Sequence, residues 1–137
     1  TEPMVLLEHH SDQGISTGRQ LRSFWATLKE THPEIAGLTG IVLDPWHLRA
    51  ATKEEFPETL GEVPLDALQA FHIHSDLHPP SPDDGMPWPQ VFATIANVPA
   101  TPRIKPVVYQ KSRVPAAIAF CGEMLAPQRT AYAAPPA

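Results

Sequence analysis

Short apolar runs alternate with amphipathic segments along this chain. Runs of consecutive apolar residues, each stopped by polar residues, glycine or proline, predict buried strands near residues 4 to 8, 40 to 44, 69 to 74 and 104 to 109. After the first run, Leu21, Phe24, Trp25 and Leu28 recur at helical spacing, with Ser16 or Thr17 as a suitable cap. Helical segments are also predicted within residues 52 to 68, 88 to 98 and 114 to 125.

The resulting order is strand then helix, repeated four times. This order is typical of an α/β protein whose strands are parallel and joined by right-handed crossovers. We expect one domain of four βα units over residues 1–126. Residues 127–137 show no periodicity and predict a flexible tail.

Composition narrows the class of partner and compartment. The net charge is −5 with only ten Lys and Arg, so we expect no nucleic-acid partner. No apolar run reaches the length of a bilayer span, and the chain start lacks the pattern of a secretory signal, so we expect no membrane association and a cytoplasmic protein. The single cysteine, Cys121, lies in an apolar stretch and is expected to be a buried thiol.

Ligand-type side chains gather where the predicted strands end. Parallel strands place function at their carboxyl ends. The side chains found there are Glu8, Asp44 with Trp46 and His47, His72 with His74 and Asp76, and Tyr109 with Gln110. In a strand His72 and His74 share one face, opposite Phe71 and Ile73. His9, His10 and His78 are weaker candidates for the site and are expected at the surface.

Carboxylates and imidazoles at one rim form a mixed oxygen and nitrogen site suited to Mn²⁺, Co²⁺, Zn²⁺ or Mg²⁺. Such an ion can hold adjacent hydroxyl and carbonyl oxygens of a sugar-like substrate and stabilise the enolate formed when the carbon between them loses a proton. Simpler explanations stay open: Glu8 can be solvated in a loop, Asp44-Pro45 can be an ordinary strand-ending turn, and a strand-end histidine can be a hydrogen-bonded residue.

The stretches "LLEHH", "GIVLDPWHL", "AFHIHSD" and "PPSPDDGMPWPQVF" resemble the second half of the xylose isomerase-like barrel superfamily, which includes sugar-phosphate isomerases and epimerases. The resemblance implies metal ligation by Glu8, Asp44 and His72, and a catalytic role for Glu8 and for His47, the histidine near metal and substrate. It also implies that His47, His74, Asp76 and Trp46 contact a small sugar-like substrate.

Two features depart from that family. Its metal site is completed by a glutamate on the eighth strand, whereas this chain offers Gln110, whose amide oxygen can ligate a cation but whose side chain cannot act as a base. An eight-unit barrel also takes about 200 residues or more, and four units are present here. We therefore expect a homo-oligomer or a separate partner that completes the barrel, or a fragment of a longer protein.

Two other functions remain open. "HIHSDLHPPSPDDG" also resembles the first motif of the polymerase-and-histidinol-phosphatase phosphoesterases, in which a metal cluster catalyses hydrolysis, although no histidine follows His78. The missing eighth-strand glutamate would also fit a non-catalytic half-barrel that binds a ligand or partner without turning it over.

Overall fold

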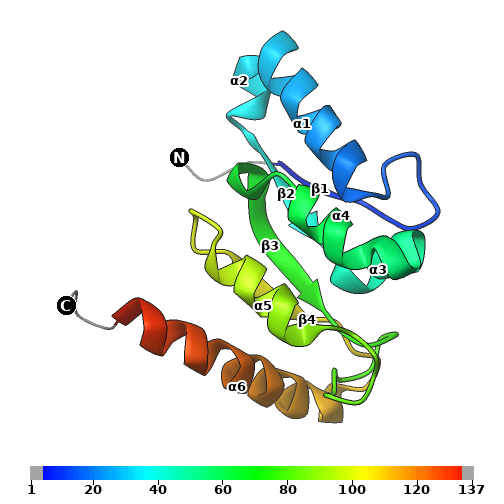
Figure 1. The fold of residues 1–137 in the computed structure, drawn as a ribbon, viewed down its shortest axis with the longest axis vertical. Coiled ribbons are helices and arrows are strands. Elements are labelled where there is room, and N and C mark those ends of the chain that lie inside the picture. The colour runs from blue at the N-terminus through cyan, green and yellow to red at the C-terminus, as the bar shows by residue number, and fades with distance from the viewer. Residues whose placement is uncertain (1–4, 134–137) are drawn as a thin grey trace.

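The fold is that of a computed structural model, which describes residues 5–133. Its four strands are β1 (Val5–Glu8), β2 (Thr39–Leu43), β3 (Leu68–Ile73) and β4 (Arg103–Pro106). They form one sheet in the order β1-β2-β3-β4, and every neighbouring pair is parallel (Figure 1). The prediction of four parallel strands, each followed by helix, is confirmed. The strand order follows the chain without the reversal that marks a doubly wound sheet.

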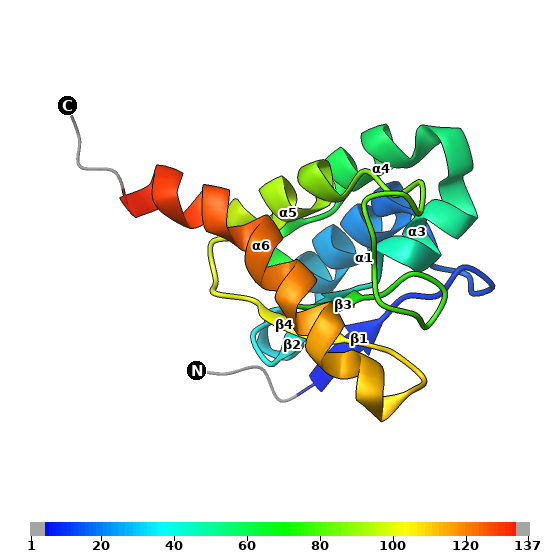
Figure 2. The same cartoon turned by 90° about the horizontal axis from the view of Figure 1, so that it is seen from below.

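Six α-helices connect and follow the strands in the described part of the chain. They are α1 (Gly18–Thr31), α2 (Pro33–Ala36), α3 (Pro45–Thr52), α4 (Phe56–Glu62), α5 (Trp88–Ala96) and α6 (Val114–Ala133), with 3-10 turns at Lys53–Glu55, Leu65–Ala67 and Lys111–Arg113. Helices α1, α3, α4 and α5 lie on one side of the sheet (Figure 2). None of the helices in residues 5–133 combines the length and apolar character needed to cross a bilayer.

Helix α1 begins where the sequence predicts. The Thr17 side chain accepts a hydrogen bond from the Gln20 backbone N–H, and the Gln20 side chain accepts one from the Thr17 backbone N–H, which forms a capping box. Gly18 lies so close to the Thr59 carbonyl of α4 that a Cβ at this position would clash with that backbone. Glycine therefore allows the two helices to pack together.

The core lies between the sheet and these helices. Ile41, Leu43, Phe71 and Ile73 point from β2 and β3 into it and are 0% exposed. Burial of each such side chain contributes roughly 1.5–3 kcal/mol. Because alternate strand residues face opposite sides, the residue between the two members of each pair, Val42 in β2 and His72 in β3, lies on the other face of the sheet. We call this other face the site face.

Three boundaries differ from the sequence prediction. The first helix after β2 is α3, which begins at Pro45 and so earlier than the helical segments predicted within residues 52 to 68, because Asp44 acts as an N-cap and Pro45 occupies the first helical position. Strand β4 ends at Pro106, short of residue 109. Helix α6 continues past the predicted end at residue 125 to Ala133, and the flexibility of residues 127–137 stays a prediction; residues 134–137, like residue 4 of the first predicted strand, lie outside the described residues.

Candidate metal centre

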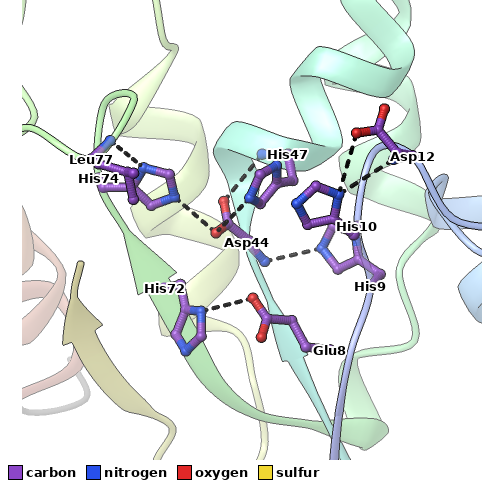
Figure 3. Close-up of polar contacts among 9 residues, drawn as sticks. All are labelled: Glu8, His9, His10, Asp12, Asp44, His47, His72, His74 and Leu77. Atoms are coloured by element: carbon purple, nitrogen blue, oxygen red, sulfur yellow. Dashed lines mark hydrogen bonds and ion pairs between the residues drawn. The ribbon is translucent and has the colours of Figure 1, made fainter. Parts of the chain in front are cut away.

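The candidate site lies at the carboxyl ends of β1, β2 and β3. Glu8 is the last residue of β1, Asp44 follows β2, and His72 is the penultimate residue of β3. Glu8 and His72 point toward each other across β2, with 3.1 Å between Glu8 Oε1 and His72 Nδ1 (Figure 3). Glu8 is exposed and His72 is half-buried. The structure therefore brings together three of the four side chains that the sequence predicts as metal ligands, without Gln110.

The spacing of these three groups fits one divalent cation. One ligand atom from each of Glu8, Asp44 and His72 lies within 4.8 Å of the other two. Metal–ligand distances of about 2.0–2.6 Å place two ligands of one ion no more than about 5.2 Å apart. Two carboxylate oxygens and one imidazole nitrogen are the donors that Mn²⁺, Co²⁺, Zn²⁺ or Mg²⁺ accepts.

Asp44 is held in place by several polar contacts. Its Oδ1 accepts a hydrogen bond from the His47 backbone N–H at 3.1 Å, and its Oδ2 lies 2.8 Å from His74 Nε2. Asp44 and His74 are each 2% exposed. Burial alone would raise the pKa of Asp44, but the hydrogen bonds from His74 and from the His47 backbone outweigh it and lower the pKa below the usual range of aspartate.

His74 orients Asp44, and a hydrogen bond from the turn after β3 fixes the tautomer of the His74 ring. The Leu77 backbone N–H donates to His74 Nδ1 at 3.0 Å, so the ring proton lies on Nε2 and is donated to Asp44 Oδ2. Asp76 and Leu77 adopt left-handed φ angles of 47° and 64°, which turn the Leu77 N–H back toward the ring. Since both ring nitrogens are engaged, His74 acts on the site through Asp44.

His47 faces the same carboxylate from α3. Its Nε2 lies 3.8 Å from Asp44 Oδ2, and its ring centroid lies 3.9 Å from that of His10. Burial lowers the pKa of His47 by more than the negative charge of Asp44 raises it, so the ring is neutral near pH 7 and can accept a proton. Asp44, His47 and His74 form a second group whose ligand atoms lie within 4.8 Å of one another.

The other predicted site residues are less closely placed. Trp46 is half-buried, with its ring centroid 6.3 Å from that of His74. Asp76 is exposed in the turn after β3, so its contact with substrate stays a prediction. Gln110 is exposed and lies beyond the end of β4, and its role as a ligand also stays a prediction. The register pairs His72 with Lys105, so Lys105 occupies the β4 position beside the site.

His9 is the site residue that the sequence analysis missed. The expectation that it lies at the surface is wrong, since His9 is 4% exposed and its Nε2 accepts a hydrogen bond from the Asp44 backbone N–H at 3.0 Å. The ring proton therefore lies on Nδ1, which has no hydrogen-bond partner among the described residues. His78 is exposed, as expected, and His10 is half-buried.

Burial of His9 predicts a stability that depends on pH. Burial lowers its pKa from 6.5 to about 4, against the opposing charge of Asp44. The unfolded chain then binds a proton between pH 6.5 and about 4 that the folded chain does not bind. The neutral His9 ring therefore makes its full contribution to the free energy of unfolding above pH 6.5. This contribution, about 3 kcal/mol in total, is lost as the pH falls toward 4.

Urea unfolding at pH 7, 6, 5 and 4.5, with a chelator present, measures this loss. We expect His9→Gln to unfold with a flatter pH dependence than the wild type, and His32→Gln, at an exposed histidine, to keep the wild-type slope. A His9→Gln protein that is as acid-sensitive as the wild type would contradict the buried neutral ring.

Comparisons of this chain with protein-family models, with curated proteins and with solved structures found no match. The chemistry of the site is therefore inferred from the residues of this chain.

Proposed function

We propose that this chain is a divalent-metal-dependent isomerase or epimerase, or a related lyase, that acts on a small sugar-like or polyol substrate. The observation that carries the proposal is the approach of Glu8, Asp44 and His72 from three neighbouring strand ends to within the reach of one ion. Parallel α/β folds commonly bind substrate at this edge of the sheet.

Each side chain has a distinct part in this proposal. Glu8, Asp44 and His72 would hold the ion, with Mn²⁺, Co²⁺, Zn²⁺ and Mg²⁺ as candidates; when bound, a divalent cation polarises hydroxyl and carbonyl oxygens of a substrate. His47, neutral and half-buried beside Asp44, accepts or returns a proton at a substrate oxygen or carbon. The exposed carboxylate of Glu8 is the second group at this rim able to exchange a proton.

Deuterium exchange tests the reaction class directly. The chain is saturated in turn with each of the four cations and incubated in D₂O with a panel of aldoses, ketoses and keto acids. We expect the carbon next to the carbonyl of a true substrate to gain deuterium, which proton NMR detects as loss of its signal, and His47→Gln to slow this exchange. A panel that shows no exchange above the His47→Gln background would contradict the proposal.

The second ligand group favours one alternative. Asp44 is shared between two groups of possible ligands, and a shared carboxylate is typical of two-metal hydrolytic centres such as those of phosphoesterases. The ratio of bound metal to protein separates the functions. One ion per chain supports the isomerase, two or three support a phosphoesterase, and none supports a non-catalytic half-barrel that binds a ligand or partner.

The open edges of the sheet support a partner that completes a barrel, either a second copy or a separate chain. Within residues 5–133, strand β1 pairs only on its β2 side, and Val5, Leu6 and Leu7 are 51%, 44% and 39% exposed. Apolar residues on an unpaired edge strand favour association with another strand. The buried Cys121, whose pKa burial raises to about 11, fits our proposal of a reducing, cytoplasmic setting.

Sedimentation velocity measures this association. We expect the wild-type chain to sediment as a species larger than a monomer, and Leu6→Lys to shift it toward the monomer because the charge cannot be buried at the new contact. Ile118→Lys, at an exposed apolar position on α6, is the comparison variant. A stable wild-type monomer that is well folded would contradict association between copies.

A further inference from the structure

Strand β4 presents two basic residues beside the candidate metal centre. The site face is identified by His72, which contacts Glu8, whereas the adjacent Phe71 and Ile73 are buried in the core on the opposite face. Side chains of alternate residues in a strand point to opposite faces. The orientation of β4 relative to these residues therefore decides which of its side chains reach the site.

The register between β3 and β4 answers this question. Ala70 pairs with Arg103, Phe71 with Ile104, and His72 with Lys105. Ile104 packs against the core, so Arg103 and Lys105 lie on the site face with Ala70 and His72. Neighbouring strands are about 4.8 Å apart, which places Lys105 one strand spacing from a predicted metal ligand.

The charges of the site groups show that Lys105 would give the metal-loaded site a net positive charge. The carboxylates of Glu8 and Asp44 would be neutralised by one divalent cation, so the positive charge of Lys105 would remain in excess. Lys105 is exposed, and it takes part in none of the salt bridges formed among the described residues. A site with this surplus is complementary to an anion.

We propose that Lys105 binds an acid group of the substrate, a phosphate or a carboxylate, beside the metal-binding residues. This inference rests on the proposed function and restricts its substrates to those that carry an acid. Arg103 lies on the same face of β4, two residues before Lys105. A lysine on an edge strand also discourages unwanted pairing, but that role requires no affinity for anions.

Anion titration tests the assignment in the full chain. Inorganic phosphate and glycolate are the two probes, added separately at low ionic strength to the Mg²⁺-saturated protein, and binding is followed by isothermal titration calorimetry. We expect Lys105→Ala to bind at least one probe about tenfold more weakly than wild type, and Lys105→Arg to stay within about threefold. Lys111→Ala, at an exposed lysine of the following 3-10 turn, should match the wild type. The probe that responds identifies the acid group.

A second arm keeps this test separate from that of the metal site. Glu8→Gln removes one carboxylate at an exposed position, and with a chelator present this variant can bind the probes without any metal. We expect Lys105→Ala to weaken probe binding in this background as well, even where the wild type binds no metal and the proposed isomerase fails. The assignment is overturned if neither probe binds in either arm, or if Lys105→Ala and Lys111→Ala lose the same affinity.

Discussion

Replacing His72 by alanine is expected to weaken the binding of a divalent cation by about a hundredfold or more. Changes to groups that merely support metal ligands cost about 10–100-fold in affinity, and the loss of a ligand costs at least as much. His72 offers the imidazole nitrogen of the Glu8, Asp44 and His72 group. The measurement is a titration with Mn²⁺ or Zn²⁺ followed by calorimetry, with the far-UV circular dichroism of each variant as a check on folding.

Two neighbouring histidines provide matched controls for this titration. His10→Ala should leave the affinity nearly unchanged, because His10 stacks on His47 and belongs to neither ligand group. His74→Gln should give an intermediate loss, since His74 orients Asp44 through a hydrogen bond. Equal losses for His72→Ala and His10→Ala would mean that any bound metal lies elsewhere.

The sheet was predictable because its signal is local. Each strand is a short apolar run with a polar stop, and the repeated alternation with helical segments predicts parallel pairing without knowledge of any contact. The convergence of Glu8, Asp44 and His72 follows from the same topology, since the carboxyl ends of adjacent parallel strands meet at one edge. The positions of these ligands therefore depend little on side-chain detail.

The burial of His9 could not be predicted in this way. Glu8 and His9 are consecutive, yet Glu8 is exposed and His9 is 4% exposed, because His9 accepts a hydrogen bond from the backbone of Asp44, 35 residues away. No periodicity encodes such a contact. Helix α3 is different, because an aspartate followed by proline is a known helix start and was available in the sequence.

The register of β4 relative to β3 could not be predicted from the sequence. The resemblance to the xylose isomerase-like barrels predicts Gln110 as the fourth ligand, in place of their eighth-strand glutamate, but β4 ends at Pro106 and its register pairs His72 with Lys105. Register depends on how neighbouring strands pack, and a shift of one residue moves every side chain to the other face. Sequence alone therefore could not tell whether β4 places a metal-binding side chain or a positively charged side chain beside His72.

Asp44→Ala is expected to lower the free energy of unfolding by about 3 kcal/mol. The substitution removes the N-cap of α3, which contributes about 1 kcal/mol, and leaves the buried Nε2–H of His74 without an acceptor, which costs about 1–3 kcal/mol. Urea unfolding at pH 7 with a chelator present measures the loss without any contribution from bound metal. Asp83→Ala, at an exposed position in the loop before α5, should stay within about 0.5 kcal/mol of wild type.

A second variant separates the two causes of this loss. Asp44→Ser keeps a side-chain oxygen suited to the cap of α3 but is too short to reach His74, so we expect a stability between those of Asp44→Ala and the wild type. If Asp44→Ser restores full stability, the contact with His74 contributes nothing and Asp44 is only a helix cap. If Asp44→Ser is as unstable as Asp44→Ala, the hydrogen bond to His74 dominates. That result would mean that the geometry of the metal site is fixed by the fold before any ion binds.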